Sequence, residues 1–336
     1  MASYRDAGVD LAAADAAVDR IEDRVTATWG HDVVGDFGGF AAGIRLPAGY
    51  SDPVLMMSTD GVGTKAEVAR RADRLDGLGW DLVAMCADDL AAAGARPIAM
   101  TDYLAVGRLV PDRVARIVAS VADACAASGI ALLGGETAEH PGVMDPDEFD
   151  LAGAVVGVVE ADAVVDGSAV QPGQAVIGII SPNLRSNGFS LIRSAVLSKV
   201  GLDEPLGDST VADVLLQPSV LYSPAVQRLL AAAPVAAMAH ITGGGLAGNV
   251  ARVLPKSVNA VIDATSWSRP AVFGSVAEIG GIAEAEMFTT FNMGIGYVAI
   301  VDSADVGAAL ASLDMPAAVV GEITPGDGSV TLAGVS

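Results

Sequence analysis

Residues whose side chains could bind phosphate and metal stand together at positions 58–65, where the chain reads Ser-Thr-Asp-Gly-Val-Gly-Thr-Lys. The segment follows an apolar run, residues 53–57, which predicts a strand. The segment is therefore expected at the carboxyl end of a strand, where α/β proteins commonly bind ligands. Glycine amides can approach an anion, Lys65 supplies a positive charge, and Asp60 can bind Mg²⁺. The pattern predicts a phosphate and metal site, although an ordinary strand-to-helix turn would look the same.

Three more acidic segments follow within the first 140 residues. They contain the pair Asp88-Asp89, then Asp102, then the run from Gly134 to Glu139, and we expect each to be a loop beside a short apolar element. Two carboxylates about 4 Å apart repel each other by about 4 kcal/mol at a protein-like dielectric, so carboxylates this dense need a cation. The four segments together favour a metal–nucleotide site over a solvated surface.

The composition limits the classes of protein and partner. A chain of 336 residues exceeds what one hydrophobic core usually serves, which predicts two domains. The net charge of −22 argues against nucleic acid and against an anionic membrane surface, because both require basic patches. The longest uncharged run, residues 229–251, contains a proline and three consecutive glycines, so we expect no membrane span. The N-terminus lacks a hydrophobic signal core, which predicts a cytoplasmic protein.

Strands and helices alternate in both halves, which predicts an α/β or α+β fold. Turn residues between 165 and 173 mark a boundary, so we expect domains at 1–168 and 169–336. Helices are predicted over residues 10–28, 66–75, 81–93, 111–128, 190–200, 224–233 and 246–253. Strands are predicted over residues 53–57, 97–103, 130–133, 152–159, 175–180, 237–241, 260–262 and 296–301. Cys86 and Cys125 lie in apolar contexts and are expected to be buried, reduced thiols.

A dinucleotide fingerprint provides one alternative. Gly243, Gly245 and Gly248 match G-x-G-x-x-G, follow a strand-like segment and precede Asp263. A Rossmann dehydrogenase is therefore a second interpretation. It leaves the acidic first half without a role.

The chain resembles the aminoimidazole ribonucleotide synthetases along nearly its whole length. Eight segments, which occur in the order of that family, carry the resemblance. They are Tyr4-Arg5-Asp6-Ala7-Gly8-Val9-Asp10, Asp60-Gly61-Val62-Gly63-Thr64-Lys65, Asp81-Leu82-Val83-Ala84-Met85-Cys86, Asp102-Tyr103, Gly134-Gly135-Glu136-Thr137-Ala138-Glu139, Ser186-Asn187-Gly188-Phe189-Ser190-Leu191, His240-Ile241-Thr242-Gly243-Gly244-Gly245, and Phe291-Asn292-Met293-Gly294-Ile295-Gly296. Any one segment is a weak signal, and the ordered set is specific.

The resemblance implies an ATP-dependent ligase of purine biosynthesis that closes formylglycinamidine ribonucleotide into aminoimidazole ribonucleotide, with release of ADP and phosphate. ATP would phosphorylate the amide oxygen to give an iminophosphate, which a neighbouring nitrogen attacks. The resemblance also implies a two-domain ATP-binding fold. The N-terminal halves of two copies would pair into a dimeric β-barrel, and a C-terminal α/β domain would close over the substrate.

The site residues implied by the resemblance fall into four overlapping groups. The expected ATP-binding residues are Asp60, Gly61, Gly63, Thr64, Lys65, Asp102, Gly134, Gly135 and Glu136. The expected Mg²⁺ ligands are Asp60, Asp89 and Glu136, and the expected catalytic residues are Lys65, Asp89 and His240. The expected ribonucleotide contacts are Arg185, Ser186, Asn187, Thr242, Gly243, Gly244 and Asn292. His240 is expected either to act as a base for the attacking amine or to bind the leaving oxygen.

Three positions depart from the family pattern. Asp88 stands where asparagine is usual, Arg185 where histidine is usual, and His140 where methionine is common. Arginine does not give up its proton, so the departure at Arg185 argues against proton transfer there while leaving phosphate binding open.

Two other functions stay open. One is another phosphoryl-transfer enzyme of the same superfamily, and the other is a non-catalytic nucleotide-sensing homologue. Selenophosphate synthetase needs a reactive cysteine near its N-terminus, whereas the first cysteine here is Cys86. The hydrogenase maturation factor needs a terminal cysteine, whereas this sequence ends in Ser336. A sensing homologue is expected to lose the acids or Lys65, and all of them are present.

Overall fold

The computed structural model describes residues 8–335, and the chain divides into two compact units. The first unit consists of the residues up to Leu90 and of Arg96–Ala161. The second unit consists of Ala91–Ala95 and of the residues from Asp162 onward. This division falls a few residues before the domain boundary predicted at residue 168. Most of the predicted segment Tyr4–Asp10 lies outside the described residues.

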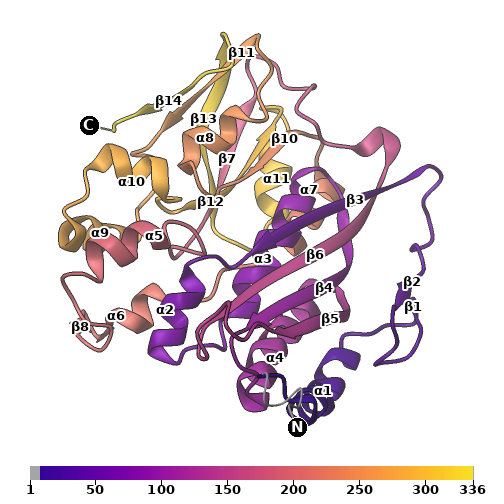
Figure 1. Ribbon diagram of the computed structural model, residues 1–336. Coiled ribbons are helices and arrows are strands. Elements are labelled where there is room, and N and C mark those ends of the chain that lie inside the picture. The colour runs from indigo at the N-terminus through magenta and orange to yellow at the C-terminus, as the bar shows by residue number, and fades with distance from the viewer. Residues whose placement is uncertain (1–7, 336) are drawn as a thin grey trace. The chain divides into compact units, whose positions relative to one another are not determined.

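The first unit is built on a four-stranded mixed sheet in the order β3-β6-β4-β5, in which only β4 and β5 are parallel neighbours (Figure 1). Its larger strands are β3 (Pro53–Gly61), β4 (Arg96–Val106), β5 (Ala131–Glu139) and β6 (Phe149–Glu160), and the short strands β1 (Val33–Val34) and β2 (Gly43–Ile44) form a separate ribbon. Its helices are α1 (Leu11–Thr26), α2 (Lys65–Ala72), α3 (Leu78–Ala92, whose last residues belong to the second unit) and α4 (Pro111–Ser128), and a 3₁₀ turn, η1 (Ala161–Ala163), follows β6.

Local sequence signals set the ends of α1 and α4. The side chain of Asp10 accepts a hydrogen bond from the backbone N–H of Ala13, as an N-cap should. Pro111 begins α4, and Gly129 ends it in the left-handed conformation. The helix predicted over residues 111–128 is confirmed.

Small residues let α3 pack closely. A Cβ at Gly79 would lie 2.1 Å from the backbone of Ser120, so α3 and α4 can approach only because this residue is glycine. On the sheet side, a Cβ at Gly157 would lie 2.2 Å from the Leu90 side chain. The Sγ of Cys86 lies 3.5 Å from the carbonyl oxygen of Gly153. Helix α3 therefore covers β6, and the helix-facing side of the sheet is the core of this unit.

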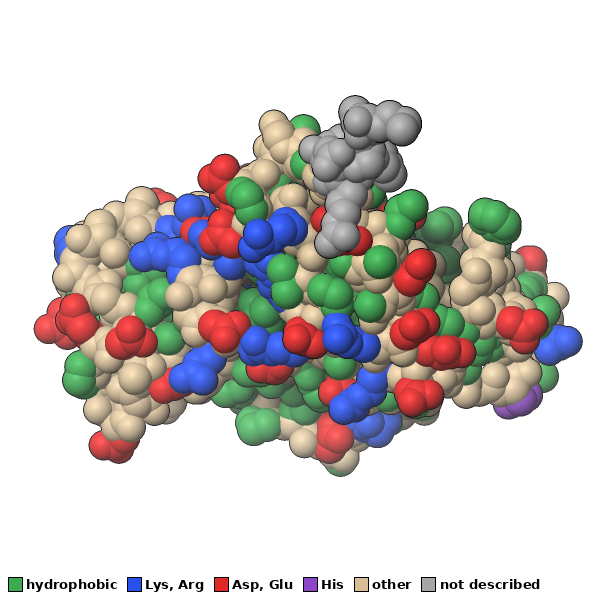
Figure 2. Space-filling view, turned by 60° about the horizontal axis from the view of Figure 1, so that its bottom comes forward, with side chains coloured by type: hydrophobic (Ala, Val, Ile, Leu, Met, Phe, Trp, Pro, Cys, Tyr) green, Lys and Arg blue, Asp and Glu red, His purple; other side chains and the backbone are tan. Residues whose placement is uncertain are grey.

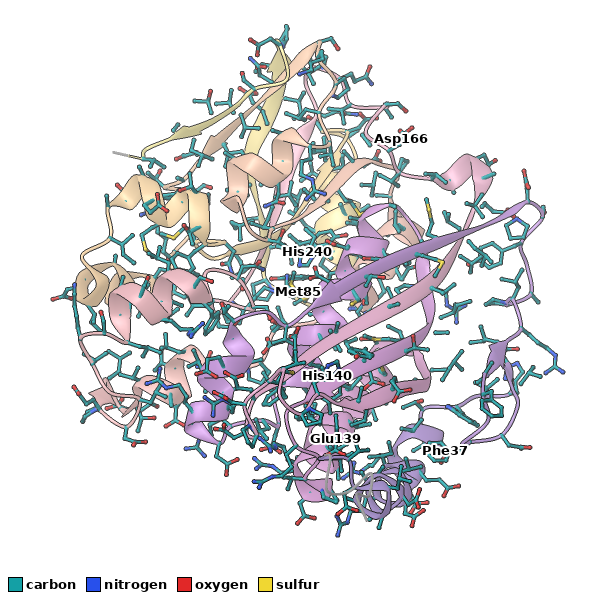
Figure 3. All side chains as sticks on the ribbon, in the orientation of Figure 1. Phe37, Met85, Glu139, His140, Asp166 and His240 are labelled. Atoms are coloured by element: carbon teal, nitrogen blue, oxygen red, sulfur yellow. The ribbon has the colours of Figure 1, made fainter. Side chains whose placement is uncertain are left out.

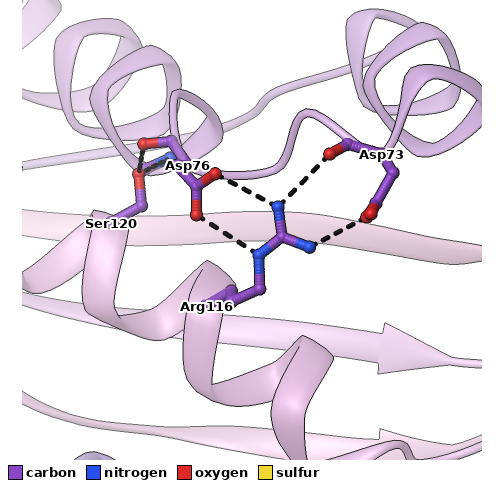
Figure 4. Close-up of polar contacts among 5 residues, drawn as sticks. Asp73, Asp76, Arg116 and Ser120 are labelled. Atoms are coloured by element: carbon purple, nitrogen blue, oxygen red, sulfur yellow. Dashed lines mark hydrogen bonds and ion pairs between the residues drawn. The ribbon is translucent and has the colours of Figure 1, made fainter.

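An arginine on α4 holds the connection between α2 and α3 (Figure 4). Arg116 donates to the carboxylate of Asp73 at 2.8 Å and to that of Asp76 at 3.1 Å. The hydrogen bond from Arg116 lowers the pKa of Asp76. Ser120 donates to the carbonyl oxygen of Asp76 at 2.6 Å. These bonds fix the helix from which the acidic pair Asp88-Asp89 projects.

The loop prediction is wrong at Asp60 and over residues 134–139, which are strand residues, whereas Asp102 and the pair Asp88-Asp89 lie in the strand and the helix predicted over residues 97–103 and 81–93. Asp60 and Gly61 are the last residues of β3, and Asp102 lies within β4. The run from Gly134 to Glu139 forms the second half of β5, and Asp88 and Asp89 lie in α3. Glycine and acidic residues have low strand propensity, but pairing with β4 supplies the backbone hydrogen bonds of β5 along its whole length.

The second unit contains a six-stranded sheet in the order β10-β12-β7-β13-β11-β14, in which only β11 and β14 are parallel (Figure 1). Its strands are β7 (Ala175–Ile180), β10 (Val235–His240), β11 (Val258–Asp263), β12 (Ile295–Val301), β13 (Ala317–Pro325) and β14 (Val330–Ala333), with a hairpin of β8 (Pro205–Leu206) and β9 (Ser209–Thr210). Its helices are α5 (Phe189–Leu191), α6 (Val211–Leu215), α7 (Ser223–Ala232), α8 (Gly245–Ala251), α9 (Ala271–Gly280), α10 (Glu284–Thr290) and α11 (Val306–Ser312), and α5 runs into a π-helical turn, η2 (Ile192–Val196).

The topology of the second unit excludes the Rossmann interpretation. Strand β10, which precedes the Gly243–Gly248 fingerprint, is an edge strand that pairs antiparallel with β12. A dinucleotide fingerprint requires a parallel βαβ unit at that point. Both units have mixed sheets with helices, so the α/β (α+β) class is confirmed.

The surface carries charges of both signs. Figure 2 shows Asp and Glu side chains interspersed with Lys and Arg on one face, rather than a single basic patch. Among residues 8–335, no helix is both long and apolar enough to span a membrane.

Candidate active site

Three of the predicted ATP-binding residues lie in one row across the sheet of the first unit. Asp60 on β3 pairs with Gly153 on β6, and Gly153 pairs on its other side with Asp102 on β4. Asp102 pairs in turn with Gly135 on β5. Residues in register on neighbouring strands point to the same face, so Asp60 and Asp102 both point to the helix-covered face. The sheet therefore brings together residues from three separate sequence segments.

The acidic pair on α3 lies close to the same row. The Sγ of Cys86 is 3.9 Å from the carbonyl oxygen of Asp60. Burial is the main reason that the pKa of the Cys86 thiol is raised to about 12, and the nearby carboxylates of Asp60, Asp89 and Asp88 contribute to this rise. Asp88 is fully buried, whereas Asp89 is exposed. Asp60 and Asp89 therefore both lie near Cys86, and Asp89 is accessible to a ligand.

Lys65, which we expected to contact ATP, lies in a buried ion pair. Its Nζ is 2.8 Å from both carboxylate oxygens of Asp81, which lies in the first turn of α3. Both side chains are only 1% exposed. This contact ties the start of α2 to α3, next to the left-handed Gly63.

A cavity of about 370 Å³ opens at the other edge of the sheet. It is lined by the apolar face of α1, the glycine-rich loop after β1, and strands β4 and β5. Figure 3 shows Phe37, which belongs to that loop, close to α1. The predicted residues among its walls are Asp102, Gly134, Gly135 and Glu136. The cavity has an apolar wall and a polar wall, as a site for a small organic ligand usually has.

Asp102 is the buried acid of this cavity. Its carboxyl is 9% exposed, and burial raises its pKa to about 7. A Cβ at Gly135 would lie 2.0 Å from its Oδ1, so residue 135 must be glycine for Asp102 to hold this position. This steric requirement explains why the second residue of the Gly134-Gly135 pair is glycine.

We predict that Asp102→Asn stabilises the ligand-free protein at pH 8 by on the order of a few kcal/mol and has little effect at pH 4. The folded pKa lies above the unfolded value, so the stability from protonated Asp102 is complete below about pH 4 and is lost as the pH rises through 7. Asparagine mimics the protonated carboxyl at every pH. Urea unfolding at both pH values measures the difference, and an equal effect at both would contradict the assignment.

The sheet does not bring Glu136 together with Asp60. Strands β3 and β5 are the two edges of the four-stranded sheet, so three strand spacings, roughly 14 Å, separate them. Among residues 8–335, no group of three or more His, Cys, Asp or Glu side chains is arranged to hold a metal ion. The last acid of the same run, Glu139, has a structural contact. Its carboxylate accepts hydrogen bonds from the backbone N–H groups of Asp10 and Leu109.

His140, next to Glu139, also contacts the sheet (Figure 3). Its Nε2 is 3.0 Å from the hydroxyl of Tyr103 on β4.

In the second unit, the glycine turn after β10 is held by two asparagines. The amide of Asn249 donates to the carbonyl oxygens of Thr242, Gly243 and Gly245. The side chain of Asn187 accepts a hydrogen bond from the backbone N–H of Gly243 at 3.1 Å. The turn thus joins two of the predicted substrate segments.

Arg185 and His240 meet beside this turn. The Nη1 of Arg185 is 2.8 Å from the Nε2 of His240, and both side chains are buried. The guanidinium also donates to the carbonyl oxygens of Gly296 and Val220 and lies over the ring of Tyr222. All of these contacts are with groups inside the protein. The guanidinium of Arg185 is therefore buried beneath the predicted ribonucleotide site and does not lie on its surface.

Two other predicted contacts differ in their surroundings. The amide of Asn292 is engaged inside the protein, because it donates to the carbonyl oxygen of Asn183 and accepts from the N–H of Gly294. The hydroxyl of Ser186 is buried and has no hydrogen-bond partner within the described residues 8–335. Buried hydroxyls are normally satisfied, so Ser186 is the residue of this group best suited to bind a ligand.

Several residues that build these sites were not predicted from the sequence. On the ATP side these are the apolar face of α1 and the loop at residues 36–42, and in the second unit they are Asn183, Tyr222, Asn249 and Tyr297. The two adjacent glycines of the loop at residues 36–42 were the one sequence feature that could have pointed to the ATP-side residues. No sequence feature pointed to the residues of the second unit, because they act through tertiary contacts.

Comparisons with known proteins define the class. Residues 40–159 match the family described as "AIR synthase related protein, N-terminal domain", and residues 171–333 match "AIR synthase related protein, C-terminal domain". Among solved structures, a thiamine-monophosphate kinase from Stenotrophomonas maltophilia has a TM-score of 0.69 at 22% identity, with 95% of this chain and 96% of that chain covered. A hydrogenase maturation protein HypE in complex with ATP has a TM-score of 0.67 at 18% identity, with 94% and 88% covered. These neighbours show a shared fold.

Curated relatives narrow the class. A phosphoribosylformylglycinamidine cyclo-ligase from Anaeromyxobacter sp. (strain Fw109-5) is 45% identical over 98% of both chains. One from Trichlorobacter lovleyi is 46% identical over 93% of this chain and 91% of its own. The chain therefore belongs to the phosphoribosylformylglycinamidine cyclo-ligase family. It is an enzyme of the ligase class, and the resemblance seen in the eight sequence segments is confirmed.

Proposed function

We propose that the chain carries out its family's ring closure, from formylglycinamidine ribonucleotide and ATP to aminoimidazole ribonucleotide, ADP and phosphate. The row that joins Asp60, Asp102 and Gly135 across one sheet, with Asp60 and Asp89 both near Cys86, carries the proposal. The row brings acids from separate sequence segments to one face of a sheet, which supports a nucleotide and metal site there.

On the ATP side, the cavity beside Asp102 would receive the nucleotide, with the Gly134-Gly135 backbone along its polar wall. Hard carboxylate oxygens suit Mg²⁺, and Asp60 and Asp89 are the pair we assign to it. Bound Mg²⁺ would neutralise charge on the phosphates. Glu136 lies too far from Asp60 to share the ion within one chain, so we keep it as an ATP contact only.

On the ribonucleotide side, the buried hydroxyl of Ser186 and the turn at Thr242–Gly244 would bind the substrate. Phosphorylation turns the amide oxygen into a leaving group, and attack by the neighbouring nitrogen forms the ring as phosphate departs. The protein's contribution is then chiefly orientation and charge stabilisation. We assign His240 to the reacting amide.

We also propose that two copies pair through the sheet of the first unit. Its helices cover one face, and the opposite face exposes large apolar side chains. Leu55 is 56% exposed, Met57 73% and Tyr103 42%. Exposed apolar residues gathered on one sheet face are typical of an interface. A second copy of the same face would cover them.

We predict that Met57→Asp weakens this dimer, raising its dissociation constant by at least about tenfold, because a charge would be buried at the interface. Analytical ultracentrifugation over a concentration series measures the change. Val143→Asp is the matched control, since Val143 is 81% exposed but lies in the connection between β5 and β6. Equal association of the two variants would contradict the proposed interface.

The test of the activity uses purified protein, formylglycinamidine ribonucleotide, ATP and Mg²⁺, with ADP and the aminoimidazole followed together. One-to-one formation of the two products is the expected result. ADP without the imidazole would instead indicate another phosphoryl-transfer enzyme of the superfamily. ATP binding without either product would indicate a nucleotide-sensing homologue.

A further inference from the structure

The contact between Arg185 and His240 restricts what the histidine can do. A guanidinium carries only donors, so the Nε2 of His240, 2.8 Å from Nη1, must be the acceptor. An imidazole that accepts at Nε2 carries its proton on Nδ1. The ring is also stacked on Tyr297, with the centroids 6.1 Å apart and the planes at 27°. Its orientation is therefore fixed on one face by stacking and at one nitrogen by Arg185.

The protein holds Arg185 in an unusual backbone conformation to make this contact. Its φ is 59°, in the left-handed region that non-glycine residues rarely occupy. The side chain of Asn183 accepts a hydrogen bond from the Arg185 N–H at 3.0 Å, and the Asn183 amide is in turn anchored on the carbonyl oxygen of Pro218. Local strain of this kind persists where surrounding contacts hold it, and it concentrates at functional sites.

Asn183 also links the strained residue to a second one. The carbonyl oxygen of Asn183 accepts from Asn292, which is followed by Met293 with a φ of 50°. The guanidinium of Arg185 lies 4.6 Å from the centroid of the Tyr222 ring, and Tyr222 donates to the carbonyl oxygen of Ile180. The contacts thus define the position of the guanidinium from several sides and hold its Nη1 against the imidazole of His240.

We propose that Arg185 is a positioning residue that locks His240 as the Nδ1–H tautomer, so that His240 serves the reaction as a hydrogen-bond donor through Nδ1 and not as a base through Nε2. The inference deepens the proposed function and rests on it for the role of Nδ1. It chooses between the two roles expected for His240: the imidazole would stabilise the oxygen that leaves, and the departing phosphate would take the proton of the attacking amine. The tautomer itself does not depend on which substrate is used.

The tautomer is measured by long-range ¹H–¹⁵N NMR of the imidazole nitrogens in the intact protein. The chain has only three histidines, so His31→Gln and His140→Gln assign the spectrum by subtraction. We expect His240 to show a protonated Nδ1 and an unprotonated Nε2. A protonated Nε2 in the wild-type protein overturns the proposal without any further variant.

Substitutions of Arg185 then test the cause. Arg185→Met should release Nε2 and populate the other tautomer, whereas Arg185→Lys, which keeps a donor, should restore the wild-type spectrum. Arg193→Met is the matched control, because Arg193 is exposed in the same unit, and it should change nothing. An unchanged His240 tautomer in folded Arg185→Met would show that Arg185 does not set it.

The role of Nδ1 is tested by a pair of variants at His240. Asparagine places its amide close to the position of Nδ1, and glutamine places its amide close to that of Nε2. We expect His240→Gln to stay folded, to keep its contact with Arg185 and to lose kcat by about 100-fold or more, the usual effect of losing one such donor. His240→Asn should unfold at a lower temperature but retain the larger kcat.

The possible outcomes distinguish a failure of the Nδ1 role from a failure of the proposed function. The reverse order of kcat, with His240→Gln the more active, would overturn the Nδ1 role. A wild-type protein with the expected tautomer but no cyclisation would leave the Arg185 contact intact and overturn the proposed function instead.

Discussion

Lys65→Met is expected to lower the free energy of unfolding by about 3–5 kcal/mol, because it leaves the carboxylate of Asp81 buried without its cation. Both side chains are 1% exposed, and Nζ lies 2.8 Å from each carboxylate oxygen, so solvent cannot replace the lysine. Urea unfolding of the ligand-free protein measures the loss. Lys256→Met is the matched control, since Lys256 is exposed, and it should stay within about 0.5 kcal/mol of wild type.

The double variant Lys65→Met/Asp81→Asn decides what Lys65 is for. Removing both charges should make the protein more stable than either single variant, because no uncompensated charge stays buried. If Lys65 also neutralises the transferred phosphoryl group, the double variant will fold but will not turn over. Recovery of both stability and turnover would show that Lys65 is structural. A double variant no more stable than Lys65→Met would contradict the buried pair itself.

The sequence predicted the elements whose signals are local. Helix α4 has a proline at its start and a glycine just after its end, and it matches the prediction residue for residue. Strand β7, an uninterrupted apolar run, also has the predicted bounds. Such elements need no knowledge of their neighbours, because caps and apolar continuity act within a few residues.

Elements that depend on a distant partner were not predicted correctly. The second half of β5 reads as a loop because it holds two glycines and two acids, and only its pairing with β4 makes it a strand. The helical prediction over residues 190–200 gave way to a short α-helix followed by a π-helical turn. Strand propensity is strongly context-dependent, so a single sequence carries little of this information.

For the candidate site, too, local features could be predicted from the sequence, whereas features that depend on distant residues could not. Family segments identified Asp60, Lys65 and His240 as residues of interest, and their side-chain chemistry is readable from the sequence. Their contacts are not. The partner of Lys65 is 16 residues away, and the partner of His240 is 55 residues away. Neither spacing corresponds to a helix or strand period, so only the folded chain reveals that Lys65 meets Asp81 and that Arg185 meets His240.

Asp60→Asn is expected to reduce kcat by at least about 100-fold while leaving the fold intact. The side chain keeps its size, and its remaining oxygen can still accept the 2.7 Å hydrogen bond from the N–H of Gly61. What it loses is the charge that, with Asp89, we assign to the metal ion. The apparent affinity for Mg²⁺ in the presence of ATP, measured by calorimetry, should therefore fall together with kcat. Thermal unfolding should change little, since the amide keeps the size of the carboxylate and its hydrogen bond from Gly61.

Asp19→Asn is the matched control, because Asp19 is an exposed acid on α1 of the same unit and should retain full activity. The combination of readouts separates the explanations for a loss. Reduced kcat with a normal Mg²⁺ affinity would move Asp60 from the metal to the nucleotide. Reduced kcat with a lower unfolding temperature would make the effect structural. Wild-type kcat and Mg²⁺ affinity in Asp60→Asn would remove Asp60 from the site, and with it the assignment of the Asp60–Asp102–Gly135 row to ATP.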